Sequence, residues 1–288
     1  MNEGKIIREI RTAKNLSLKQ AAGNDMTASF VAKFERGDSD ISLTRFYELL
    51  DNLHVSINEY DLYCNRYGRQ QAQQDDKEFM TAWQIGSATN IKRIAKRYET
   101  HYDKYQDEND NYRYLLFSAI AYAIDNDKTL EAKPVQPVAD YLFVTDPWGV
   151  NELYLLRYAT YVFNHDTMIT MSRIIGEAGN NYLSDYNYRH EYMLVINNMV
   201  SRLFEMKEYS RAKNLIEFTL SRAIEDDWAI MTRLKFIDSL IVSIVNDDDT
   251  VLNQAKQLIN IPRCLGFNDL AMKLDVLLRH RGEDMTKL

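Results

Sequence analysis

The chain has 288 residues, and 45% of them are hydrophobic, which is an ordinary globular fraction that can fill the core of one large domain or two unequal ones. With only 10 glycines and 4 prolines it has too few structure breakers for an all-β protein rich in turns, so we expect an all-α fold. The net charge of −7 argues against a protein coated in nucleic acid along its whole length and against a polybasic membrane-surface protein, but it leaves room for a local DNA-binding face.

The N-terminal residues and the longest apolar run indicate a cytoplasmic protein. Met1–Lys5 has no apolar signal segment, and the longest apolar run, Leu115–Ile124, is about half of a bilayer span. Cys64 and Cys264 lie 200 residues apart without partner spacing, so neither a disulfide nor a zinc site is indicated. We expect two buried thiols, no metal, no cofactor and no membrane partner.

Five short helices of roughly ten residues are predicted over residues 5–63, and two of them form a helix-turn-helix. Ser17 is a good N-cap for a helix over residues 18–22, which Gly23-Asn24-Asp25 breaks. Thr27 caps a second helix over residues 28–36, which ends at Gly37. The length of this second helix is close to that of a DNA-recognition helix.

One face of the second helix suits the major groove. We expect Val31 and Phe34 to face inward, and small or polar residues to be exposed on the other side: Ala28, Ser29, Ala32 and Lys33. Ser29 can then hydrogen-bond base edges, Lys33 can reach guanine or phosphate, and Ala28 can touch a thymine methyl group. The alternative is a five-helix bundle in which this helix is merely solvated.

Charge is polarised within this N-terminal region. Residues 1–36 contain seven Lys or Arg against four acids, whereas residues 37–60 contain one against five. Lys5, Arg8, Lys14 and Lys19 can meet phosphates, together with backbone amides at the start of the second helix. The predicted DNA-binding residues are Lys5, Arg8, Arg11, Lys19, Thr27, Ala28, Ser29, Ala32, Lys33 and Arg36.

Residues 67–76 are polar and Gln-rich, which indicates a linker or an exposed helical arm. Beyond them apolar residues recur at three and four spacings in six segments: Phe79–Ile94, Tyr112–Ile124, Leu153–Phe163, Tyr192–Phe204, Ala212–Ile224 and Leu234–Val245. The turn leading to Ala212 is echoed 43 residues later at Ala255, as in a degenerate helical repeat. We therefore predict a helix-turn-helix domain over 1–66, a linker over 67–76 and a helical-repeat domain over 77–288.

Specific residues carry a family resemblance. Five residues match the XRE-type, lambda-repressor-like helix-turn-helix, in which the arginine of the first helix pairs with the glutamate of the recognition helix: Arg11, Ser17, Ala22, Glu35 and Gly37. More narrowly, Phe34–Leu43 followed by Phe46, Leu49, Leu50 and Leu53 resembles the Rgg family of transcription regulators. The resemblance continues in Tyr141-Leu142-Phe143, Trp148, Glu152-Leu153, Asn198, Tyr209 and Ala212.

This resemblance implies a quorum-sensing regulator. It implies a homodimer on double-stranded promoter DNA, whose TPR-like repeat domain senses short pheromone peptides imported into the cell. The chain departs from the family at two positions. Leu18 stands where the wider XRE family often has a phosphate-contacting Gln, and Tyr158 stands where many Rgg-like chains have Asn.

An extended peptide requires side-chain amides for its backbone and aromatic residues for its apolar side chains. Asn198 and its neighbour Asn197 are the first candidates, and an aromatic run with one cation, Arg157, is the second. Arg157 could pair with the C-terminal carboxylate or an acidic side chain of the peptide. The predicted peptide-binding residues are Trp148, Tyr154, Arg157, Tyr158, Tyr161, Asn197 and Asn198; tyrosines at helical spacing also fit repeat packing.

The sequence gives little support to catalysis, because it has no phosphate loop or hydrolase motif and its five His are scattered without ligand spacing. We therefore expect a protein that is not an enzyme. Two alternatives stay open: a helical-repeat interaction protein that sequesters a protein partner, and a DNA-binding regulator with a non-peptide ligand.

Overall fold

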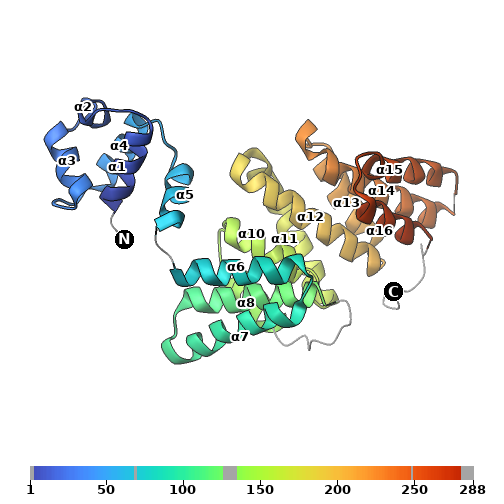
Figure 1. Cartoon of the computed structure of the whole chain (residues 1–288). Helices are drawn as coiled ribbons and strands as arrows, with labels where there is room; N and C mark the ends of the chain where they lie inside the picture. The colour runs from blue at the N-terminus through green and yellow to red at the C-terminus, as the bar shows by residue number, and fades with distance from the viewer. Residues whose placement is uncertain (1–2, 68–69, 126–134, 248, 280–288) are drawn as a thin grey trace. The chain divides into compact units, whose positions relative to one another are not determined.

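The computed structural model describes residues 3–67, 70–125, 135–247 and 249–279, and this part of the chain is helical without a strand (Figure 1). The predicted all-α class is therefore confirmed. The chain divides into two compact units, one up to Met80 and the other from Thr81 onward.

Five helices build the first unit around one apolar core. They are α1 (Glu3–Ala13), α2 (Leu18–Ala22), α3 (Ala28–Arg36), α4 (Leu43–Asn52) and α5 (Ile57–Tyr67). The residues that α1, α3 and α4 contribute to this core are the apolar ones of each helix, among them Ile7, Ile10, Val31, Leu49 and Leu50. This packing of amphipathic faces fixes α3 against α1, because short helices have little stability of their own.

The segment predicted as a linker is helical over most of its length, since α6 (Gln70–Gln84) begins within it. Of the two interpretations of residues 67–76, the backbone over 70–76 therefore favours the helical arm. The apolar spacing noted over Phe79–Ile94 extends across two helices: α6 ends at Gln84, and Gly86 has a φ of 64° in the turn before the next helix. A position with positive φ favours glycine, which adopts this conformation without steric cost. The spacing of apolar residues alone does not reveal that a helix ends at such a turn.

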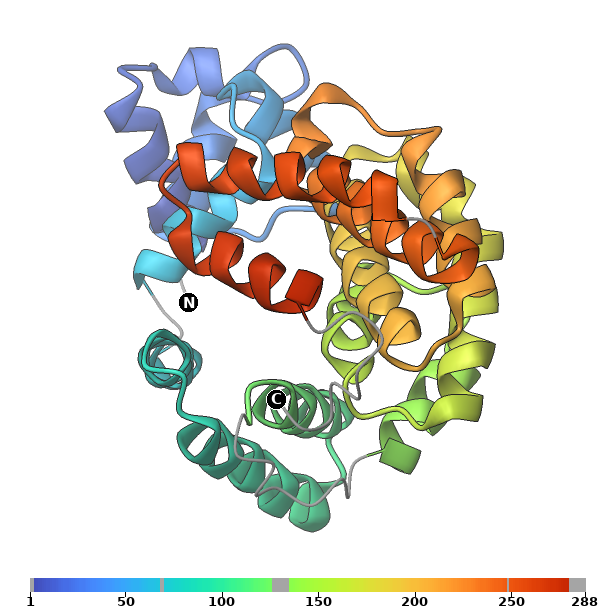
Figure 2. The same ribbon diagram turned by 90° about the vertical axis from the view of Figure 1, so that its right-hand side faces the viewer.

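The second unit consists of paired helices with two short 3₁₀ turns. Its helices are α7 (Ala88–Tyr105), α8 (Glu108–Ala123), α9 (Val135–Val144), α10 (Val150–Ala159), α11 (His165–Ser184), α12 (Tyr186–Glu205), α13 (Tyr209–Leu220), η1 (Glu225–Asp227), α14 (Trp228–Asn246), η2 (Asp249–Val251), α15 (Leu252–Cys264) and α16 (Asn268–Arg279). In Figure 2 they follow a curve from α7 and α8 to α15 and α16.

Two rows of helices make up this curve. In one row α8 packs on α10, α10 on α12, and α12 on α14, whereas in the other row α11 meets α13 less extensively. We call α8, α10, α12 and α14, the row with the more extensive mutual contacts, the inner row. Ala212 and Ala255, the two alanines of the predicted repeat, are fully buried. The free thiols differ from expectation, because Cys64 is half-buried and Cys264 is exposed.

Candidate nucleic-acid interface and ligand-binding face

Side-chain caps fix the ends of α2 and α3 as the sequence predicts. The Ser17 hydroxyl accepts a hydrogen bond from the Gln20 amide, and the Gln20 side chain accepts one from the Ser17 amide. The Thr27 hydroxyl accepts from the Phe30 amide at 3.1 Å, and Gly37 closes α3 with a φ of 81°. These caps satisfy backbone donors at the helix starts and set the length of α3.

The two faces of α3 differ as its sequence suggests. Val31 and Phe34 are buried in the core of the unit, while Ser29 and Lys33 are exposed. Ala28 and Ala32 are half-buried, less open than predicted. An exposed serine and lysine beside two small side chains leave room for a close approach to base edges.

Arg11 and Glu35 form a buried ion pair that ties α1 to α3. Arg11 Nε lies 2.6 Å from Glu35 Oε1, and Arg11 Nη2 lies 2.8 Å from Glu35 Oε2. A third donor, Nη1, reaches the Leu16 carbonyl at 2.8 Å. The hydrogen bond to Glu35 raises the pKa of Arg11, and the pairing agrees with what the XRE resemblance implies. Arg11, predicted as a DNA contact, is thus engaged inside the unit and supports α3.

A close backbone crossing holds the same two helices. A Cβ atom on Gly4 would lie 1.9 Å from the Phe34 carbonyl oxygen, so only glycine allows α1 to approach α3 in this way. Sequence reasoning missed this position, because a lone glycine near a helix start looks like an end signal.

The other predicted cations differ in their surroundings. Lys5, Arg8 and Lys19 are exposed, as phosphate contacts must be. Lys14 instead donates to the His54 carbonyl at 2.7 Å and lies 3.5 Å from Glu59.

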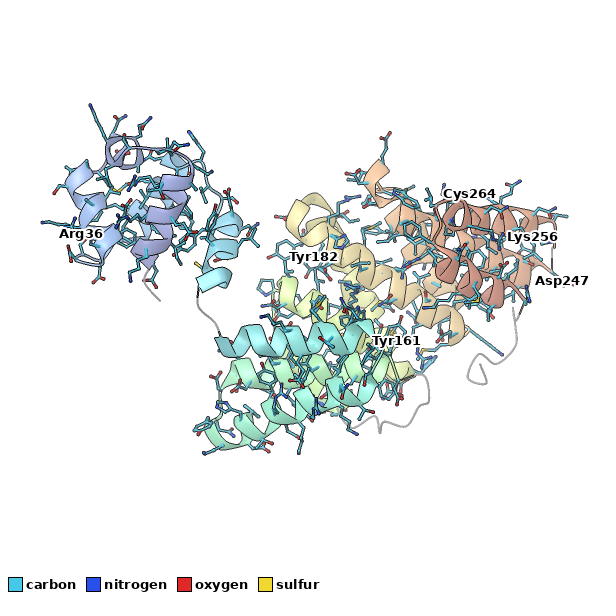
Figure 3. The ribbon with its side chains drawn as sticks, in the orientation of Figure 1. Arg36, Tyr161, Tyr182, Asp247, Lys256 and Cys264 are labelled. Atoms are coloured by element: carbon cyan, nitrogen blue, oxygen red, sulfur yellow. The ribbon has the colours of Figure 1, made fainter. Side chains whose placement is uncertain are left out.

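Arg36, labelled in Figure 3, lies at the end of α3. Its Nε is 2.7 Å from Asp38 Oδ2, and both side chains are half-exposed. A pair this exposed contributes little stability, so Arg36 can exchange Asp38 for a phosphate.

Two of the predicted peptide contacts are core residues. Trp148 is 7% exposed, and its Nε1 donates to the Leu142 carbonyl at 2.9 Å. Tyr158 is 6% exposed and packs edge-on against Trp83 with 5.9 Å between ring centroids. Burial raises the pKa of Tyr158, as it does for a phenol held in a packed interface. Trp148 and Tyr158 therefore fit the alternative interpretation, in which these aromatic side chains pack between repeats.

Arg157 and Tyr154 remain accessible beside them. The Arg157 guanidinium lies over the rings of Tyr158 and Tyr154, 5.1 and 6.0 Å from their centroids. Its Nη1 is 3.6 Å from Glu191 Oε2 on α12. Arg157 is thus already partnered by an acid of the chain.

The two predicted asparagines lie where α12 meets α10. Asn198 Nδ2 donates to the Arg157 carbonyl at 2.9 Å, and the Asn197 amide donates to Asn198 Oδ1 at 3.1 Å. Asn197 is 7% exposed and its Oδ1 has no hydrogen-bond partner among the described residues. The pair couples the two inner helices and retains one free acceptor.

Tyr161, labelled in Figure 3, follows α10 and is surrounded by charges that the sequence analysis did not select. Burial raises its pKa, with a smaller contribution from Glu205, while Arg157, Arg233 and Arg202 act in the opposite direction. Arg202 and Glu205 lie on α12, and Arg233 lies on α14. The four-residue spacing from Asn198 to Arg202 places both on one helical face and was the available signal.

Buried polar atoms on this inner face lack partners. Within the described part of the chain, no hydrogen bond reaches Asn197 Oδ1, Arg202 Nε or Arg233 Nε. Buried polar groups are nearly always paired in folded proteins, so these three unpaired atoms on α12 and α14 make this region a candidate binding surface. We call the exposed side of α10, α12 and α14 around Tyr161 the inner face.

Comparison with known proteins identifies the family. Residues 95–276 match the C-terminal domain of the HTH-type transcriptional regulator Rgg, and residues 7–60 match a helix-turn-helix family. The chain belongs to the Rgg family of transcriptional regulators. The helix-turn-helix of this Rgg regulator includes α2 and α3, and the Rgg match covers α10, α12 and α14.

Solved structures share the fold of this Rgg regulator at low identity. The SHP pheromone receptor Rgg2 of Streptococcus dysgalactiae superposes with a TM-score of 0.76 at 18% identity, covering 96% of this chain and 98% of that one. A bacterial peptide pheromone/receptor complex superposes with a TM-score of 0.68 at 14% identity, covering 96% of this chain and 97% of that one. The PrgX/cCF10 complex gives 0.67 at 14% identity, with 97% and 99% covered.

The described residues of this Rgg regulator contain neither a candidate metal site nor a candidate membrane span. Over 3–67, 70–125, 135–247 and 249–279, no three His, Cys, Asp or Glu side chains come together as a metal site. None of the helices in those ranges is both long and apolar enough to cross a membrane.

Proposed function

We propose that this Rgg regulator binds promoter DNA through the exposed face of α3, and that a short signalling peptide on the inner face of the repeat unit controls this binding. The observation that carries the DNA part is the capped, rigidly supported α3, which exposes Ser29 and Lys33. A helix that docks a protein partner would expose large apolar side chains instead. The partner-sequestering alternative therefore has less support.

The peptide part is supported by the chemistry of the inner face. Unpaired amide and guanidinium groups beside tyrosines match the needs of an extended backbone with carboxylates and apolar side chains. Two of the structurally similar proteins are named as a pheromone receptor and a peptide pheromone/receptor complex. A regulator with a non-peptide ligand is the alternative that the test below separates.

The assembly and location follow from the same proposal. Helix-turn-helix proteins commonly read two half-sites as a dimer, so we propose a homodimer in the cytoplasm, where promoter DNA is accessible. A ligand then acts by shifting the freedom or the distance between the two α3 helices. The protein on this proposal regulates transcription and is not an enzyme.

The test is DNA binding by the full chain to the promoter region beside its own gene, at two salt concentrations. Short apolar peptides encoded nearby are added in turn. Salt-sensitive, sequence-specific binding that a peptide alters by fivefold or more, roughly the range of allosteric couplings, supports the proposal. Specific binding that ignores every peptide refutes peptide control and favours another ligand. The absence of specific binding at either salt concentration favours partner sequestration.

A further inference from the structure

A pocket of about 610 Å³ lies at the C-terminal end of the repeat unit, between α14 and the α15–α16 turn. The first two turns of α14 form one wall, and the turn around Gly266 forms the other. Its apolar lining includes Trp228, Pro262, Phe267 and Leu270, and Arg233 contributes the charged group. The volume is typical of a site for a small organic ligand or for a few residues of a peptide.

No counter-charge for Arg233 is found among the side chains that the structure describes. Arg233 makes no ion pair or hydrogen bond with any of them, and its Nε is buried. Burial lowers its pKa, while the neighbouring Tyr161 acts in the opposite direction. Arg233 is half-buried, so an anion that pairs with its guanidinium would offset the cost of this partial desolvation.

The other cations near Tyr161 are already neutralised. Arg157 lies 3.6 Å from Glu191, and Arg202 Nη1 lies 2.7 Å from Glu205. Of the three arginines that act on Tyr161, Arg233 is therefore the one without an ion pair to a described side chain. The sequence suggested that Arg157 on α10 pairs with a carboxylate of the peptide. The structure favours Arg233 on α14 for this role.

Two large apolar side chains that line the pocket with Arg233 are exposed to solvent. Trp228 is 44% exposed and Phe267 is 56% exposed, although each could bury a large area against a bulky partner. An aromatic or branched side chain can thus enter the pocket while a neighbouring carboxylate meets Arg233. A C-terminal residue supplies both groups by itself, and two adjacent residues supply them where the backbone is not fully extended, since neighbouring side chains of an extended strand point to opposite faces.

We propose that this pocket binds a peptide segment in which a bulky apolar residue adjoins a carboxylate, with the carboxylate held by Arg233 and the apolar side chain between Trp228 and Phe267. The proposal rests on peptide control and adds the chemical class that the regulator selects. A C-terminal carboxylate and an acidic side chain offer the same chemistry, and the probes below separate them.

The probes are four capped dipeptides titrated into the full chain by calorimetry or ligand-observed NMR. Acetyl-Leu-Phe with a free carboxylate is compared with its C-terminal amide, and acetyl-Asp-Phe-amide is compared with acetyl-Asn-Phe-amide. The charged member of at least one pair should bind about tenfold more tightly than its neutral twin, as expected for hydrogen bonds to a charged group. The pair that shows the preference identifies the source of the carboxylate.

Variants assign the preference to the pocket. Arg233→Gln should remove the charge preference, Arg233→Lys should retain part of it, and Phe267→Ala should weaken all four probes. Arg173→Gln is the matched control, because this arginine is 62% exposed and pairs with Glu177 on α11. Binding without a charge preference, a preference that survives in Arg233→Gln, or the absence of binding by all four probes overturns the proposal.

Operator binding measured on the same proteins separates this proposal from peptide control. An Arg233-dependent charge preference in a protein whose operator affinity ignores every peptide would support the pocket and refute peptide control. Peptide-sensitive operator binding without an Arg233-dependent charge preference would support peptide control and refute the pocket.

Discussion

Replacing Arg11 by methionine would leave the Glu35 carboxylate buried without its cation. The two side chains are only 13% and 5% exposed, and two donors of Arg11 hold both carboxylate oxygens. Removing one partner of such a pair costs about 3–5 kcal/mol, because the remaining charge is uncompensated. A unit of this size has a total stability of roughly 4–12 kcal/mol, at about 0.05–0.15 kcal/mol per residue, so the variant should lose a large share of it.

Native-state hydrogen exchange on the full chain measures this loss locally. The amides of α3 in Arg11→Met should exchange roughly 150-fold faster than in the parent, or about 3 kcal/mol at 1.4 kcal/mol per factor of ten. The double variant Arg11→Met with Glu35→Leu contains no buried charge and should recover most of the protection. The reasoning fails if the single variant accelerates exchange less than about tenfold, or if the double variant is as weakly protected as the single one.

Three further outcomes follow from particular contacts. Lys33→Ala should lower discrimination between operator and mutated operator by about 1–3 kcal/mol in fluorescence anisotropy, while Lys92→Ala on α7 should leave it unchanged; equal discrimination in both proteins would remove Lys33 from base readout. Gly4→Ala should lower the melting temperature of the first unit and cost about 1–3 kcal/mol, since the new methyl group meets the Phe34 carbonyl at 1.9 Å; an unchanged melt would contradict the close crossing. Burial raises the pKa of Asp238 above 3.8, so the folded state binds this proton more tightly than the unfolded chain, and the stability penalty of the carboxylate is relieved as the pH falls through the raised value. Asp238→Asn should therefore raise the urea midpoint at pH 7 by an amount that shrinks towards pH 4, and a gain that is independent of pH would refute this sign.

Local signals in the sequence were enough to place α3, the helix proposed to read DNA. Ser17, Thr27 and Gly37 act through hydrogen bonds and backbone conformations confined to a few residues, so the residue types alone predicted α2 and α3. The Arg11–Glu35 pair joins residues 24 positions apart, and only the family resemblance anticipated it. Gly4 shows the limit of such signals, because its role depends on where another helix passes.

The proposed ligand-binding face was predicted less completely for the same reason. Trp148 and Tyr158 have amphipathic side chains that suit either a groove or a packed interface, and tertiary packing buried both. Arg202 and Arg233 look like ordinary surface cations until the inner row of helices places them beside Tyr161. Which face of a repeat helix lines the inside of the curve depends on contacts between helices, and the apolar period leaves that open.

Reciprocal coupling between operator and peptide tests the central claim most directly. With a peptide that alters operator affinity, its own affinity for the full chain is measured without DNA and at saturating operator. Linkage requires the two ligands to change each other's affinity by the same factor, so we predict a peptide dissociation constant that shifts by the factor seen for the operator. A peptide that binds equally well with and without operator would contradict control of DNA binding from the repeat unit.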